Sequence, residues 1–129
     1  MKQEPRIQPT PSELEILQIL WSRGPSTVRE IHEVLGEEKE VGYTSALKLL
    51  QIMTTKGLVT RSEDQRAHVY TATLPAEKTK QQFAADVLHR VFRGSASQLM
   101  QHVLSGKRGS KKEIDEIRRM LDEYERKLP

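Results

Sequence analysis

The hydrophobic period of this 129-residue chain changes at Gly57, and this change constrains the fold more than any other feature of the sequence. Before Gly57, apolar residues recur at helical spacing in three short segments. After it, Leu58–Arg61 and Ala67–Thr73 are rich in β-branched and aromatic residues, with a polar run at 62–66 between them. This pattern predicts a β-hairpin. Three small helices followed by a hairpin is the order of a winged helix-turn-helix, so we expect a mainly α fold with a small β-hairpin.

Capping signals set the bounds of the first two helices. A capping-box pattern with a proline at the first helical position opens the first helix at Thr10–Glu13, and Gly24-Pro25 ends it. The second helix is expected to begin near Ser26 or Thr27 and to end around Gly36. The charged residues 37–40 then predict a surface turn.

The third helix, predicted over Gly42–Lys56, carries a candidate DNA-contacting face. The major groove admits one helix side-on, so the outer face of that helix should be polar or basic. Thr44, Lys48, Gln51 and Thr55 are spaced by three or four residues and share a face opposite the apolar positions. Lys48 can reach guanine or phosphate, and Gln51 can pair with an adenine edge. Our expected DNA contacts, including two from the hairpin, are Tyr43, Thr44, Ser45, Lys48, Gln51, Arg61 and Arg66.

A polar helix face can also be merely solvated, and this alternative stays open. The acidic pair Glu63 and Asp64 at the hairpin tip and the acidic turn at 37–40 count against a strongly basic docking surface. The formal net charge of +3 permits an anionic partner without requiring one.

Three more helices are predicted after the hairpin, giving a winged-helix domain over residues 1–74 and a helical domain over 75–129. Pro75 opens a long fourth helix, which Gly94-Ser95 interrupts. A short fifth helix through Leu104 and a basic link at 105–110 lead to the last helix, which begins with a second capping-box pattern.

The last helix and the fourth helix both carry apolar stripes whose exposure to water is unfavourable. On the last helix the apolar residues step by alternating threes and fours, which is the seam of a coiled coil. Fully burying one such side chain is worth roughly 1.5–3 kcal/mol, and the small head has little surface to cover both stripes. We therefore predict a homodimer, with a helix folded back on its own chain as the alternative. The expected dimerisation residues are Phe83, Val87, Val91, Ile114, Ile117, Leu121, Tyr124 and Leu128.

The composition narrows the function classes. The chain has no cysteine, which removes disulfides, thiol catalysis and cysteine-ligated metals together. The polar N-terminus leads into no apolar segment, and no apolar run approaches the ~20 residues that span a membrane. We expect a cytoplasmic protein without cofactors or metals.

The order of several short motifs resembles the penicillinase-repressor family (the BlaI/MecI/CopY type). The resemblance covers nearly the whole chain and rests on the runs Thr10–Trp21, Thr27–Ile31, Tyr43–Ser45, Lys56–Arg61 and Phe92–Ser95, followed by the closing amphipathic helix. It implies a dimeric winged-helix repressor of dyad-symmetric operator DNA, often for β-lactamase or copper-resistance genes. The implied DNA contacts map onto Tyr43, Thr44, Ser45, Lys48 and Arg66.

Two departures from the family pattern bear on the inducer, the signal that would release the protein from its operator. Copper-responsive members carry a cysteine cluster near the C-terminus, and this chain has none. Members controlled by a membrane sensor protease are cut at an Asn-Phe bond, where this chain has His102 and Val103. The resemblance therefore supports repressor function better than it supports any inducer, and a regulatory protease that cuts at or near His102–Val103 stays an open alternative.

The sequence supports other functional interpretations less well. The four histidines lack a partnered nucleophile, so we predict no enzyme activity. Asp86 and His89 could donate two metal ligands from one helix, although such a pair is more often a surface contact. The main alternative is a winged-helix adaptor that binds proteins and does not read DNA.

Overall fold

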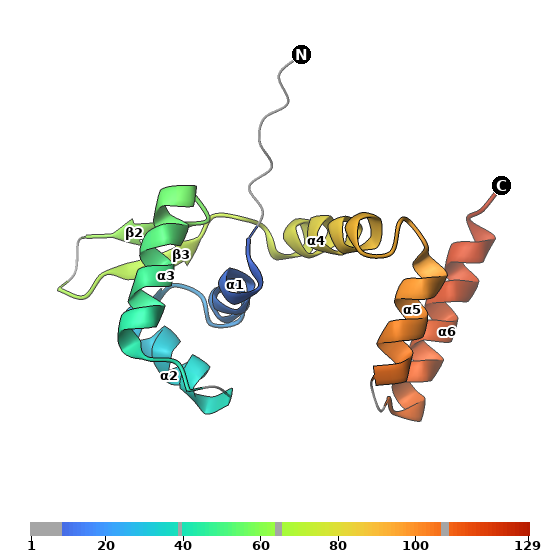
Figure 1. Cartoon of the computed structure of the whole chain (residues 1–129), viewed down its shortest axis with the longest axis horizontal. Helices are drawn as coiled ribbons and strands as arrows, with labels where there is room; N and C mark the ends of the chain where they lie inside the picture. Colours follow the sequence, from blue (N-terminus) through green and yellow to red (C-terminus); the bar gives the residue numbers. More distant parts are fainter. Residues whose placement is uncertain (1–8, 39, 64–65, 107–108) are drawn as a thin grey trace, which may run out of the picture. The chain divides into compact units, whose positions relative to one another are not determined.

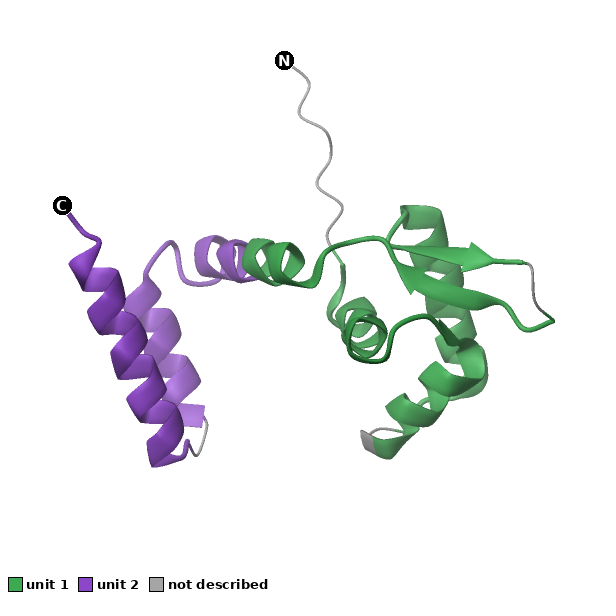
Figure 2. Ribbon diagram, turned by 180° about the vertical axis from the view of Figure 1, so that it is seen from behind, with its two compact units in different colours: residues 1–83 green, residues 84–129 purple. Residues whose placement is uncertain are grey.

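The computed structural model describes residues 9–38, 40–63, 66–106 and 109–129, and it divides the chain into two compact units (Figures 1 and 2). Unit 1 is Met1–Phe83 and unit 2 is Ala84–Pro129. The elements are, in order, α1 (Pro11–Arg23), β1 (Ser26–Thr27), α2 (Val28–Glu38), α3 (Tyr43–Lys56), β2 (Val59–Ser62), β3 (Val69–Ala72), α4 (Ala76–Arg90), α5 (Ala96–Gly106) and α6 (Lys111–Arg126). The predicted fold class is confirmed, because three helices and a small antiparallel sheet form a winged helix that further helices follow. Residues 64–65 of the predicted hairpin turn and 107–108 of the predicted link lie outside the described residues.

The predicted capping signals of α1 are confirmed. The Thr10 backbone N–H donates to Glu13 Oε1 at 2.8 Å, and the Glu13 N–H donates back to Thr10 Oγ1 at 3.3 Å. At the other end Gly24 has φ 89°, a conformation that favours glycine, and its N–H donates to the Leu20 carbonyl oxygen at 2.8 Å. Both ends of α1 are therefore defined by local interactions.

The sheet has three strands in the order β1-β3-β2, where the sequence predicted only the β2–β3 hairpin. Ser26 pairs with Tyr70 and Thr27 with Val69. A two-residue strand has no periodicity to detect, and its pairing joins positions more than 40 residues apart, so no local pattern announces it. Thr27 also begins α2 through a second reciprocal bond pair, in which the Thr27 N–H donates to Glu30 Oε1 at 2.9 Å and the Glu30 N–H to Thr27 Oγ1 at 3.2 Å.

The predicted end of the second helix at Gly36 is wrong, because α2 continues to Glu38 and takes in part of the expected surface turn. Gly36 keeps a helical backbone and is absent from the glycines with positive φ. A glycine inside a helix costs only about 1 kcal/mol relative to alanine. That cost is small enough for the helix to continue two residues past Gly36.

The core of unit 1 holds α3 firmly in place. Ala46, Leu50 and Met53 on α3 are completely buried, and they belong to one cluster with buried residues of α1, α2, β2 and β3. Gly57, with φ 81°, ends α3 as predicted, and the Leu58 N–H donates to the Met53 carbonyl oxygen at 2.9 Å. The other buried apolar residues are Ile16, Leu17, Ile19, Leu20, Val28, Ile31, Leu35, Leu58, Val59 and Tyr70.

The first turns of α4 belong to unit 1, so the division into units falls after Phe83, whereas the sequence placed a domain boundary after residue 74. Trp21 Nε1 donates to the Leu74 carbonyl oxygen at 3.0 Å, and the Lys80 ammonium lies 5.9 Å from the centroid of the Trp21 ring. Thr79 is buried and donates its hydroxyl to the Pro75 carbonyl oxygen. These contacts attach the start of α4 to the winged-helix head.

Within unit 2, α5 and α6 lie side by side in both views (Figures 1 and 2). A small hollow between them is lined by Val103, Leu104, Ile114 and Ile117, among others. No described residue of either helix is buried. None of the helices in the described part of the chain has the length and apolar character needed to cross a membrane.

Candidate nucleic-acid interface

The outer face of α3 is an open polar surface. Thr44, Ser45, Lys48, Gln51 and Thr55 are all exposed, directly opposite the buried side of the same helix. Tyr43 at the start of α3 is 49% exposed. The helix, whose opposite side is buried in the core, thus exposes all five of its predicted contacts, which are Tyr43, Thr44, Ser45, Lys48 and Gln51.

The N-terminus of α3 has no side-chain cap and is suited to accept an anion. Gly42 is the N-cap and supplies no side-chain hydrogen bond to the helix, and the first helical bond runs from the Ala46 N–H to the Gly42 carbonyl oxygen at 3.1 Å. The N–H groups of the first turn therefore have no side-chain acceptor from the cap. Together with the helix dipole, this arrangement favours a phosphate oxygen.

His32 on α2 positions the start of α3, a role that the sequence did not indicate. Its Nε2 lies 2.6 Å from the Val41 carbonyl oxygen, and because that oxygen can only accept, the Nε2 atom carries the hydrogen. The His32 ring also meets the Tyr43 ring edge-on, with centroids 5.9 Å apart. These contacts hold the turn of the helix-turn-helix, and nothing in the local spacing of these residues could have revealed them.

An ion pair joins the start of α1 to the end of α3. Lys56 Nζ lies 2.9 Å and 3.0 Å from the two carboxylate oxygens of Glu13, whose side chain is only 2% exposed. Burial acts to raise the pKa of Glu13, but the hydrogen bond from the Thr10 N–H and the pairing with Lys56 outweigh it and leave the pKa lowered. The sequence indicated only a capping role for Glu13, because its partner Lys56 lies 43 positions away along the chain.

The two predicted hairpin contacts differ in their surroundings. Arg61 on β2 donates to Glu63 Oε1 at 2.6 Å, and this hydrogen bond is the main cause of the raised pKa of Arg61. Arg66 is exposed and precedes β3 in the hairpin. A phosphate would therefore compete with Glu63 for Arg61.

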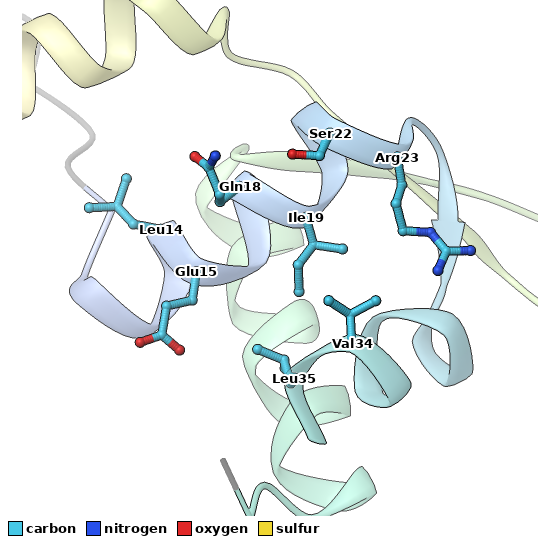
Figure 3. A pocket seen from close by; sticks show the side chains of 8 residues that line it. All are labelled: Leu14, Glu15, Gln18, Ile19, Ser22, Arg23, Val34 and Leu35. Carbon is cyan, nitrogen blue, oxygen red and sulfur yellow. The ribbon is translucent and has the colours of Figure 1, made fainter. Parts of the chain in front are cut away.

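A groove of about 490 Å³ lies between α1 and α2 and contains none of the predicted DNA contacts (Figure 3). Its apolar lining comes from Leu14, Ile19, Val34 and Leu35, and its polar lining from Glu15, Gln18, Ser22 and Arg23. Arg23 is paired with Glu30 at 2.9 Å.

The candidate metal pair on α4 has another explanation. Asp86 accepts a hydrogen bond from Arg90 Nε at 2.7 Å, one helical turn away. Among the described residues, no group of three or more potential ligands could hold a metal ion.

The predicted dimerisation residues are largely uncovered in the single chain. Ile114 is 41% exposed, Leu121 61% and Tyr124 67%, while Val91 and Leu128 are also exposed. Phe83, Val87 and Ile117 are half-buried. His102 and Val103 lie in the middle of α5, where both are exposed and the His102 ring is 5.5 Å from the Phe92 ring.

Residues 9–123 match the sequence model of the family described as "Penicillinase repressor". The chain belongs to the penicillinase repressor family. The transcriptional regulator BlaI of Mycobacterium tuberculosis is 32% identical over 115 residues, which are 88% of this chain and 82% of that protein. The penicillinase repressor of Staphylococcus aureus is 21% identical over 116 residues, 90% of this chain and 92% of that protein. The solution structure of the DNA-binding domain of the repressor BlaI aligns with a TM-score of 0.49 and 22% identity, over 59% of this chain and 90% of that one.

Membership of the penicillinase repressor family confirms the resemblance found in the sequence. The match extends from α1 through most of α6, so it includes unit 2 as well as the winged-helix head. The member described here is accordingly a winged-helix transcriptional repressor.

Proposed function

We propose that this repressor acts as a homodimer on a dyad-symmetric operator, with α3 of each subunit in the major groove and the β2–β3 hairpin beside it. The observation that carries the proposal is the polar outer face of α3, which is exposed along its length and backed by three completely buried residues. Its first-turn N–H groups, to which the Gly42 cap offers no side-chain acceptor, would add a phosphate site at the point where a recognition helix meets the backbone.

Each exposed side chain of α3 has a role in this proposal that follows from its chemistry. Lys48 contacts a guanine edge or a phosphate, and Gln51 pairs with an adenine edge. Tyr43, Thr44 and Ser45 in the first turn donate hydroxyls to phosphate oxygens. Arg66 contacts the backbone from the hairpin, and Arg61 does so after exchanging Glu63 for phosphate.

The dimer would form through the apolar seam of α6 and the stripe on α4. Packing of α6 beside α5 in the same chain leaves Leu121, Tyr124 and Leu128 more than half exposed, so α5 does not cover the seam. A second copy related by a two-fold axis would cover it and would present two α3 helices about 34 Å apart, one turn of DNA.

Proteolysis in α5 would end repression by separating α6 from the rest of the chain. The His102–Val103 bond lies on an exposed helix without a single buried residue among those described, so its local unfolding costs little. Genes of the β-lactamase type are the proposed targets, in keeping with the family.

The first test is selection of preferred duplexes from a random library by the full-length chain, followed by titration near ~0.15 M salt against a scrambled duplex. Specific binding should exceed nonspecific binding at least ~10³-fold, with two subunits per site. Equal binding to both duplexes would contradict the proposal and favour a protein-binding adaptor.

Lys48→Ala tests the proposed reading face directly. We expect the operator affinity to fall at least about tenfold, because one contact is lost in each half-site. If Lys48 meets phosphate, the slope of log affinity against log salt should also become shallower by roughly 1.8, or 0.9 for each subunit. Lys78→Ala, at an exposed lysine of α4, is the matched control and should change neither quantity. Equal affinities for the two variants would rule out α3 as the reading helix.

A further inference from the structure

Ile52 is an apolar side chain on the outer face of α3. It is 40% exposed, and it follows Ser45 and Lys48 at spacings of seven and four residues, so the three lie along the same side of the helix. The other exposed residues of α3 are Tyr43, Thr44, Ser45, Lys48, Gln51 and Thr55, which all carry a polar group.

The fold itself gives no reason for an isoleucine at this position. Ile52 belongs neither to the buried core nor to the partly buried residues packed against it. A β-branched residue is also a poorer helix former than alanine, leucine or lysine, since its side chain loses rotational freedom in a helix. Neither core packing nor helix propensity therefore accounts for Ile52.

The immediate surroundings of Ile52 point to a ligand with a small apolar group next to polar ones. Ile52 lines a shallow hollow of about 330 Å³ together with Lys48, Gln51, Thr55 and Lys56. Lys48 and Gln51 are the side chains best suited to hydrogen-bond base edges in the major groove. The one apolar group that a base pair displays in that groove is the C5-methyl of thymine.

We infer that Ile52 is a specificity-determining residue that contacts the C5-methyl of one thymine in each half-site, beside the bases read by Lys48 and Gln51. This inference rests on the proposed function, since it requires α3 to lie in the major groove. It adds an apolar contact to the hydrogen-bonding ones and predicts that thymine, and not merely an A·T pair, is recognised at that position.

Deoxyuridine provides the test, because it pairs as thymine does and lacks only the methyl group. The probe is the duplex selected by the full-length chain, with each thymine replaced in turn by deoxyuridine in both half-sites. Burying one methyl is worth about a fourfold change in affinity, so two half-sites should give roughly a 15-fold loss at the position that Ile52 contacts. For Ile52→Ala, the same replacement should change the affinity less than twofold, while replacements elsewhere keep their wild-type effects.

Thr44→Ser is the matched control, because it removes a methyl from another exposed residue of α3 and leaves Ile52 in place. It should retain the full loss at the Ile52 position. Ile52→Ala should also keep its fold, as judged by thermal unfolding, since Ile52 lies outside the core. A selected duplex in which no thymine has a deoxyuridine effect that depends on residue 52 would overturn the inference and leave the proposed function intact. Failure to select any preferred duplex would instead refute the proposed function, and this inference with it.

Discussion

Truncation of Leu121 on α6 is the sharpest test of the proposed dimer. Leu121 occupies the middle of the seam and is 61% exposed in the single chain. Leu121→Ala removes most of the apolar surface that a partner would cover. Alanine is the best helix former, so the substitution should leave α6 itself intact. Any loss of association can then be attributed to the seam.

The expected size of the effect follows from the exposed fraction. Fully burying a leucine is worth about 1.5–3 kcal/mol, so covering the 61% of Leu121 that remains exposed is worth about 1–1.8 kcal/mol. Two-fold symmetry counts this contribution twice. Because alanine retains a small part of the surface, Leu121→Ala should weaken the dimer by about 2–3 kcal/mol, or about 30- to 150-fold in the dissociation constant.

Sedimentation equilibrium over a wide range of protein concentration would measure the dimer dissociation constant of the wild type and of Leu121→Ala. Met120→Ala is the matched control, because Met120 is 64% exposed but lies outside the alternating spacing of the seam. It should change the dissociation constant by no more than about threefold. A Leu121→Ala protein that associates as tightly as the wild type would refute the proposal that Leu121 is covered in the dimer.

Two other predictions concern charges. Glu63→Gln should free Arg61 and raise the operator affinity several-fold, with a larger gain at low salt. Glu33→Gln makes an equal charge change on α2 and should have little effect on the operator affinity. An unchanged operator affinity for Glu63→Gln would mean that Arg61 does not contact the DNA. The pKa of Glu13 is lowered in the fold, so its contribution to stability is present above the unfolded pKa and is lost as the pH falls through the folded pKa. The free energy of unfolding, measured in urea, should therefore decrease once the pH is below about 4.5. Lys56→Met should make that drop smaller, because without the ammonium the folded pKa of Glu13 rises toward its unfolded value. It should also cost about 1 kcal/mol near neutrality, less than for a fully buried pair because Lys56 is over a third exposed. An acid profile identical to that of the wild type would show that the pair has no influence on Glu13.

The parts of the structure that the sequence predicted correctly depend on neighbours close along the chain. The reciprocal bonds of Thr10 and Glu13 join residues three apart, and the left-handed Gly57 ends α3 one residue after Lys56. The polar face of α3 and the apolar seam of α6 follow from helical spacing alone. Local hydrogen bonding and periodicity therefore determined the winged-helix order, the exposed polar face of α3 and the apolar seam of α6.

Only the tertiary structure decided the contacts that join distant segments. The pairing of β1 with β3, the ion pair of Glu13 with Lys56 and the bond from Trp21 to the Leu74 carbonyl oxygen span about 40 to 50 positions. Such contacts form because burial of the core brings particular surfaces together, and a sequence pattern records which residues are buried without recording which of them meet.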